Sequence, residues 1–189
     1  MKSLFIALAL MTAGIANADS CHKHEPAANV GPASAGPAVT SIPDVKVITQ
    51  DGKTVDFYSD LIKGKVVAVN FVFTTCTTVC PPLGAIFGKL QEQQAGAQLV
   101  SVSIDPEVDT PQRLKAWGAK FGARPGWTLV TGKKEDIVRI LKAMNAYSPD
   151  FANHQPVTLV GNDATGTWKR SYGFTTAAKL SVMLKELGS

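Results

Sequence analysis

The stretch Phe73–Pro82, FTTCTTVCPP, decides the fold of this chain. It follows an apolar segment, Val66–Val72, whose short length and β-branched side chains predict a buried strand. Behind it, apolar side chains recur at the spacing of an amphipathic helix, namely Leu83, Ile86, Phe87 and Leu90. The sequence therefore predicts that Cys76 and Cys80 lie on the turn from a central strand to a helix, which is typical of a functional site.

The two cysteines of this turn are predicted to ionise readily. Because Cys80 precedes Pro81, and a residue before proline is disfavoured in the helical region, we expect the helix to begin only at Pro82. Free backbone N–H groups and the positive end of the helix dipole would then lower the pKa of both thiols. Two such sulfurs can exchange with disulfides or hold a soft metal ion.

The N-terminal residues 1–18 have the pattern of a secretory signal peptide, with a basic start and an apolar core. The small residues at its end predict cleavage after Ala18 and export to the periplasm. The apolar core is too short to cross a bilayer, so we expect no stable membrane span after processing. Lipid attachment at Cys21 is the alternative, against which the preceding Asp19 and Ser20 argue.

Residues 19–42 are rich in alanine, proline and glycine and are predicted to form a flexible tail. Cys21, His22 and His24 lie near the start of this tail, and a thiol with two imidazoles suits copper or zinc. The cluster predicts a second, metal-capturing site. Incidental polar residues in an unstructured tail are the alternative.

Residues 43–189 are predicted to form one domain in which strands alternate with helices. Asp51-Gly52 is a turn signal between short strands at 45–48 and 54–57, which indicates an N-terminal β-hairpin. Further strands are expected at 99–104, 127–130, 157–160 and 167–172. Further helices are expected after Thr110 with Leu114, Trp117 and Phe121, around Ile137, Ile140, Leu141 and Met144, and after Thr175 or Thr176. The whole pattern predicts an α/β fold with a central mixed sheet flanked by helices.

Composition excludes several classes of function. The net charge of +4 is spread thinly along the chain, which argues against a nucleic-acid partner. No Gly-rich phosphate loop follows a predicted strand, and no serine nucleophile elbow occurs. Of the cysteines and histidines, the predicted domain contains only Cys76, Cys80 and His154. His154 lies in a loop that can meet the cysteine turn, although a lone loop histidine is more often an ordinary surface residue.

Three features together resemble the Sco/SenC family: FTTCTTVCP at 73–81, SIDPEVDT at 103–110 and the late His154. The resemblance runs over most of the predicted domain. It implies a thioredoxin-like fold and one copper ion per domain, as Cu(I) or Cu(II), bound by Cys76, Cys80 and His154. It also implies a role in metallating, or preparing, the dinuclear copper centre of cytochrome c oxidase.

The same resemblance implies the partners of the chain. They are a copper-accepting oxidase subunit or another periplasmic copper protein, and a thiol reductant of thioredoxin type. Thiolates suit Cu(I), an added imidazole makes Cu(II) tolerable, and oxidation of the cysteine pair to a disulfide would abolish the site. The chain departs from the family pattern at Asn153, where members carry Asp, and at Pro156. An amide orients a neighbouring imidazole less well than a carboxylate does, so these departures bear on copper affinity and on the choice of partner.

Other interpretations of the cysteine pair use no metal. The first is a periplasmic thiol–disulfide oxidoreductase that uses Cys76 and Cys80 directly. A peroxiredoxin-like peroxidase would need a threonine three residues before the reactive cysteine, where this chain has Phe73. An inert disulfide between the two cysteines would stabilise the fold little, because so short a loop removes little chain entropy.

Overall fold

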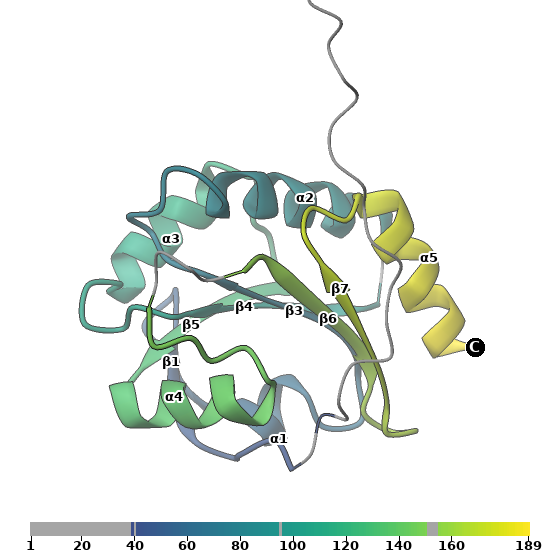
Figure 1. Cartoon of the computed structure of the whole chain (residues 1–189), viewed down its shortest axis with the longest axis horizontal. Coiled ribbons are helices and arrows are strands. Elements are labelled where there is room, and N and C mark those ends of the chain that lie inside the picture. Colours follow the sequence, from purple (N-terminus) through teal and green to yellow (C-terminus); the bar gives the residue numbers. More distant parts are fainter. Residues whose placement is uncertain (1–38, 40, 95, 151–154) are drawn as a thin grey trace, which may run out of the picture.

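The computed structural model describes residue 39 and residues 41–94, 96–150 and 155–189. The predicted signal peptide, the tail cluster of Cys21, His22 and His24, and His154 therefore lie outside the described residues. The described part forms a seven-stranded mixed sheet in the order β2-β1-β5-β4-β3-β6-β7, with helices on both faces (Figure 1). This arrangement confirms the predicted α/β class and the N-terminal hairpin.

The elements follow the chain in a mostly alternating order. The strands are β1 (Lys46–Thr49), β2 (Thr54–Asp56), β3 (Val66–Val72), β4 (Gln98–Ser103), β5 (Trp127–Gly132), β6 (Val157–Asn162) and β7 (Thr167–Tyr172). The helices are α1 (Phe57–Leu61), α2 (Cys80–Gln93), α3 (Pro111–Ala119), α4 (Lys134–Ala143) and α5 (Ala177–Gly188). Within the described ranges, no helix combines the length and the apolar character that a membrane crossing requires.

The strand directions bring several chain segments to one edge of the sheet. β3, β4 and β5 run parallel, β1 and β6 run antiparallel to them, and β7 runs antiparallel to β6. The ends of β3, β4, β5 and β7 and the start of β6 consequently lie along the same edge. We call this the cysteine edge, because the turn that carries Cys76 leaves β3 there.

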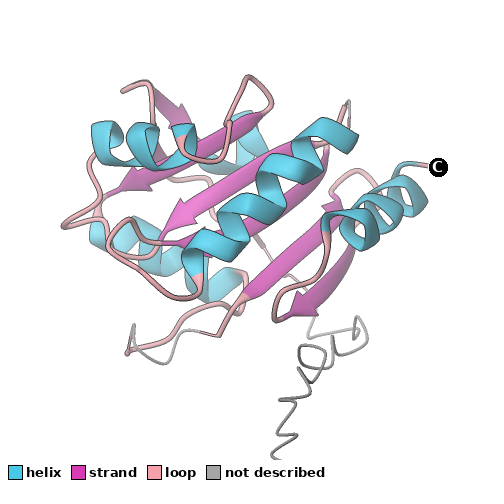
Figure 2. Ribbon diagram, turned by 90° about the horizontal axis from the view of Figure 1, so that it is seen from above, coloured by secondary structure: helices cyan, strands magenta, loops and turns pink. Residues whose placement is uncertain are grey.

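Two hydrophobic cores cover the two faces of the sheet. The core under α1 and α4 includes Phe57, Phe71 and Ile140, and the core under α2, α3 and α5 includes Phe87 and Trp127. Figure 1 shows these two helical layers on opposite sides of the sheet, and in Figure 2 the helices of the second layer lie in front of the strands and run roughly along them. A strand covered on both faces needs apolar side chains in both directions, which explains the nearly continuous apolar run of β3.

The short helix α1 differs from the predicted strand, which was expected to extend to Phe57. Phe57 is instead the first residue of α1, and its side chain is fully buried. The carboxylate of Asp44 accepts hydrogen bonds from the backbone N–H groups of Tyr58 (3.1 Å) and Ser59 (3.0 Å). These N–H groups lie in the first turn of a helix and have no partner within it. Asp44, which is 14 residues before Tyr58 in the sequence, therefore stabilises the start of this helix, and no local sequence pattern predicts the contact.

Two other helix boundaries were only partly predicted. Thr110 caps α3 as expected, with its hydroxyl accepting from Arg113 N, but α3 ends at Ala119, so Phe121 lies beyond it. The Phe121 ring packs edge-on against Trp117 at 4.7 Å between ring centroids. Thr176, rather than Thr175, caps α5.

Candidate metal and thiol site

The cysteine turn connects β3 to α2 in a few residues. Cys76 N donates to Phe73 O at 3.2 Å, which closes a tight turn directly after the strand. The expectation that Cys80 precedes the helix is wrong, since Cys80 is the first residue of α2 and two prolines follow it. Their missing N–H groups cost nothing, because donors in a first helical turn have no acceptor within the helix. Burial of the Cys80 side chain in the core under α2 favours this placement.

The two sulfurs have different surroundings. Both cysteines are free thiols; Cys76 keeps 9% of its surface exposed, whereas Cys80 is fully buried. The backbone N–H of Cys80 donates to Cys76 Sγ at 3.3 Å, so the start of the helix supports the Cys76 sulfur directly. The pair therefore combines one cysteine that keeps a small exposed fraction with one that is fully buried.

This difference separates the acidities of the two thiols. Burial raises the pKa of Cys76, but hydrogen bonds from the Cys80 thiol and from backbone N–H groups of the turn outweigh it. The pKa of Cys76 consequently lies below that of an ordinary thiol, as predicted. For Cys80 the prediction is wrong, because burial first, then its hydrogen bond to Cys76 and the negative charges nearby, raise the pKa of the Cys80 thiol. Proximity to a helix N-terminus is too weak to offset complete burial.

The segment 103–110 closes over the end of β3 beside the cysteine turn. Ser103 is the last residue of β4 and pairs with Val72, and Ile104 N donates to Val72 O at 2.9 Å. Asp109 lies fully buried at the end of this segment, directly before the cap of α3. Its carboxylate accepts hydrogen bonds from Ser103 Oγ (2.6 Å) and from Thr74 N (3.1 Å). The SIDPEVDT segment is thus hydrogen-bonded to the cysteine turn, a contact that the sequence motif alone did not predict.

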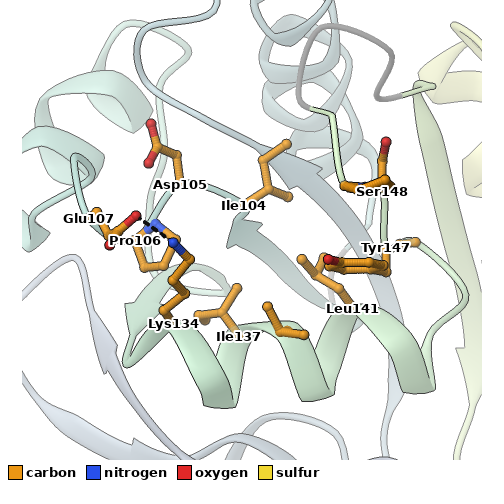
Figure 3. A pocket seen from close by; sticks show the side chains of 12 residues that line it. Ile104, Asp105, Pro106, Glu107, Lys134, Ile137, Leu141, Tyr147 and Ser148 are labelled. Atoms are coloured by element: carbon orange, nitrogen blue, oxygen red, sulfur yellow. Dashed lines mark hydrogen bonds and ion pairs between the residues drawn. The ribbon is translucent and has the colours of Figure 1, made fainter.

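A cavity of about 160 Å³ also opens at the cysteine edge, on the face that α4 covers (Figure 3). Ile104, Leu141 and Tyr147 supply apolar walls, and the ion pair between Lys134 Nζ and Glu107 Oε2, at 2.8 Å, lies at one end. Neither cysteine lines this cavity. It is therefore a neighbour of the thiol site on the other face of the sheet.

The third predicted ligand cannot be placed beside the sulfurs. Among the residues that the structure describes, no three His, Cys, Asp or Glu side chains are grouped so that they could hold a metal ion. His154 lies outside those residues, but both ends of its loop are described. Arg170 of β7 donates to Met144 O (2.7 Å) and Asn145 O (3.2 Å) where the loop begins, and Gly173 N donates to Pro156 O (2.8 Å) where it ends.

Arg170 is a residue that sequence reasoning missed. Only 3% of its surface is exposed, although it lies in a hairpin strand, where a charged residue usually faces water. Its guanidinium donates to the carbonyl oxygens of Met144 and Asn145, just beyond the last residue of α4, where carbonyl groups have no donor within the helix. The loop that carries His154 and the strand next to the cysteine edge are therefore tied together. No signal in the sequence distinguishes this arginine from a solvated one.

Comparison with known proteins identifies relatives of the chain. The model of the SCO1/SenC family matches residues 37–165. A SCO1 protein homolog of Bacillus subtilis is 38% identical over 94 residues, which are 47% of this chain and 48% of that protein. The chain thus spans about half the length of such curated relatives.

Solved structures with the same fold agree with this match. A SCO1/SenC family lipoprotein from Bacillus anthracis is 31% identical with a TM-score of 0.64, covering 78% of this chain and 95% of that one. BsSco, described as a member of the Sco family of cytochrome c oxidase assembly proteins with a disulfide switch, is 27% identical (TM-score 0.63; 77% and 92% covered). Arabidopsis thaliana ScoI, solved with copper bound, shares the fold at 24% identity (TM-score 0.58; 75% and 94% covered).

Proposed function

Because the chain belongs to the SCO1/SenC family, we propose that it is a copper-binding protein of cytochrome c oxidase assembly and that Cys76 and Cys80 hold the copper. One observation carries this proposal: two reduced cysteines meet at the start of α2, where the N–H of Cys80 contacts the Cys76 sulfur at 3.3 Å. Thiolates are the protein ligands that copper(I) prefers. The donor chemistry of the turn therefore fits copper.

The proposed third ligand is His154. Its loop is tied at both ends to β7 and the residue after it, through Arg170 and Gly173. Since β7 ends at the cysteine edge, these ties favour a position of the loop near the sulfurs. Two thiolates suffice for Cu(I), and an imidazole also makes Cu(II) tolerable, so one ion in either state fits this ligand set.

Copper is the cargo of this site, and its release follows from the same chemistry. A site with three protein ligands leaves a position open, through which a ligand of the recipient can enter before one of the three leaves. The proposed recipient is the protein that carries the dinuclear copper centre of cytochrome c oxidase, or another exported copper protein. Oxidation of Cys76 and Cys80 to a disulfide removes both sulfur ligands, so copper binding is tied to the redox state of the pair.

The test is an anaerobic copper titration of the reduced chain, read by the number of ions bound and by the sulfur-to-copper charge-transfer absorption. We expect one ion in the domain and its loss in Cys76→Ser and in Cys80→Ser. His154→Ala should lower the affinity by at least the roughly 10- to 100-fold that the loss of a partner of a ligand costs, since it removes the ligand itself. Gln155→Ala, one residue away, is the matched control and should bind as the unaltered chain does. Unchanged affinity in His154→Ala would eliminate the three-ligand site.

A second candidate function is thiol–disulfide exchange without metal. The contrast between Cys76, which keeps 9% of its surface exposed, and the fully buried Cys80 favours it, because the attacking thiol must be the more accessible of such a pair. A reductant of thioredoxin type would then keep the pair reduced. His154→Ala separates the two functions, since it should leave the rate of thiol exchange unchanged while it weakens copper binding.

The export of the chain and the role of its tail complete the proposal. Cleavage after Ala18 would deliver the domain to the periplasm, where exported copper proteins are available as partners. Cys21, His22 and His24 are proposed to capture a further metal ion. Replacing all three with serine or alanine should lower the number of copper ions bound or slow copper uptake. If neither changes, the tail has no part in metal capture.

A further inference from the structure

The buried carboxylate of Asp109 is held by hydrogen bonds and not by an ion pair within the described part of the chain. Its side chain is fully buried, and within the described residues no lysine or arginine forms an ion pair with it. Arg113, one helical turn away, donates from Nε to Thr74 Oγ1 at 3.3 Å instead. Burying an ionised carboxylate is costly unless hydrogen bonds compensate for the lost water. The hydrogen-bond donors that face Asp109 therefore show what holds this buried side chain in place.

Most of these donors belong to one residue of the cysteine turn. Thr74 gives Asp109 both its backbone N–H, at 3.1 Å to Oδ1 and 3.2 Å to Oδ2, and its hydroxyl, at 2.5 Å to Oδ1. The remaining donor is Ser103 Oγ, at 2.6 Å to Oδ2. Thr74 stands two residues before Cys76, in the segment where the chain has left β3 and no sheet pairing holds it. Asp109 is thus the anchor of that segment.

Asp109 is itself held firmly against the sheet. Its backbone N–H donates to Asp105 O at 2.9 Å, and Asp105 N donates to Ser103 Oγ at 3.1 Å. Ser103 pairs with the last residue of β3, and α3 begins directly after the cap at Thr110. The position of the carboxylate is therefore fixed by β4 on one side and by α3 on the other.

We propose that Asp109 is a positioning residue for the cysteine pair: through Thr74 it holds the turn so that Cys76 Sγ stays against the first residue of α2. This inference rests on the proposed function, because it assumes that Cys76 and Cys80 act together. It adds that a residue outside the cysteine turn sets how closely the two sulfurs are held. The SIDPEVDT segment thereby acquires a role in the chemistry of the site.

Closure of the disulfide measures this positioning directly. When the reduced chain reacts with oxidised glutathione, Cys76 and Cys80 lose two electrons and form one S–S bond, while the glutathione disulfide bond breaks. The two glutathione thiols released take up the two protons that the cysteines give up. The equilibrium constant of this exchange is the effective concentration of one cysteine at the other, and it falls when the turn becomes free to move.

Three variants distinguish the effect of the hydrogen bonds to Thr74 from the effect of a negative charge at position 109. Asp109→Ala removes every acceptor, and the effective concentration should fall roughly tenfold, the loss expected from one or two net hydrogen bonds. Asp109→Asn keeps an Oδ1 that can accept from both groups of Thr74 and should stay within about twofold of the unaltered chain. Thr74→Val removes the hydroxyl, which donates to Asp109 and accepts from Arg113 Nε, but keeps the backbone donor, and we expect a fall of about threefold.

A matched control uses another carboxylate that ties a loop. Asp163 accepts from Tyr58 Oη at 3.2 Å and from Gly64 N at 2.8 Å, near the start of β3 and so at the opposite end of that strand. Asp163→Ala should lower the melting temperature without changing the glutathione equilibrium. All variants are measured as folded full chains, with the fold checked by circular dichroism. The anaerobic copper titration is repeated on each, and copper retention should fall in the same order as the effective concentration.

Three results would overturn the proposal. The first is an Asp109→Ala chain whose glutathione equilibrium and copper retention equal those of the unaltered chain. The second is an Asp109→Asn chain as impaired as Asp109→Ala, which would mean that the charge matters and the anchor does not. If Asp109→Ala fails to fold, the third is an unchanged equilibrium in Thr74→Val. An unaltered chain that neither binds copper nor forms the disulfide would instead refute the proposed function.

Discussion

Replacing Gly88 with alanine should destabilise this protein, against the usual effect of that change in a helix. Gly88 lies in the middle of α2 and is buried where the helix meets the turn after α3. A Cβ added there would come closer than 3.0 Å to the carbonyl oxygen of Phe121, a separation that real Cβ atoms do not show. The neighbouring backbone would therefore have to move.

The size of the effect follows from two opposing contributions. Helix propensity alone makes alanine more favourable than glycine by about 1 kcal/mol. Overpacking that forces a backbone shift costs about 1–3 kcal/mol. The shift is hard to accommodate here, because Phe121 N is bonded to Gly118 O at 3.0 Å and Gly122 N to Ala119 O at 3.2 Å, so the carbonyl cannot swing away freely. We therefore place the overpacking cost in the upper part of its range, at about 2–3 kcal/mol. The expected net loss is then about 1–2 kcal/mol, which for a chain of this size lowers Tm by roughly 2–8 °C.

Thermal and urea denaturation followed by circular dichroism measure this loss. Gly188→Ala is the matched control, since Gly188 is also helical but a Cβ there would meet only Val66 Cγ2 at an ordinary 3.6 Å. That variant should be neutral or slightly stabilised. A Gly88→Ala chain as stable as the unaltered one would refute the reasoning, because propensity would then outweigh the contact between α2 and the turn at Phe121.

Three further predictions concern the thiols, the buried arginine and the helix caps. The rate at which iodoacetamide alkylates Cys76 should rise with pH through a midpoint below that of an ordinary thiol, because the pKa of Cys76 is lowered. Cys80, whose pKa is raised by burial, should stay unmodified until the chain unfolds. Mass spectrometry at several pH values checks both results. Arg170→Met should cost about 2 kcal/mol in urea denaturation, since two carbonyls at the end of α4 lose their donor, and Arg170→Lys should cost less. Thr110→Ala and Thr176→Ala should each cost about 1 kcal/mol in the same assay, as lost helix caps.

The periodic elements of the fold could be predicted because their information is local. The apolar run Val66–Val72 and the apolar stripe on α2 indicate which side chains are buried, and the turn residues Asp51 and Gly52 predict the hairpin. The cysteine turn was located in the same way, from a strand pattern that gives way to a helix pattern. Short α1 was missed because its first turn is capped by Asp44, a contact that no periodicity records.

The chemistry of the site could be predicted only in outline. Residue type and spacing identify Cys76 and Cys80 as the reactive pair, and a helix N-terminus predicts an acidic thiol at each. The structure confirms this for Cys76 and reverses it for Cys80, because the depth of a side chain below the surface depends on how α2 packs against the sheet. A prediction from backbone dipoles cannot include that burial.

The sequence by itself determined the α/β class, the position of the cysteine turn and the family of the chain, because these depend on residue types and spacings along a few adjacent segments. Only the tertiary structure decided which cysteine is the more deeply buried, that Asp109 accepts hydrogen bonds from Thr74, 35 residues away, and that Arg170 donates to the carbonyls where the loop after α4 begins. Such contacts join segments that are distant in the chain. They arise only when the parallel strands bring their ends to one edge of the sheet, and that geometry leaves no trace in local sequence.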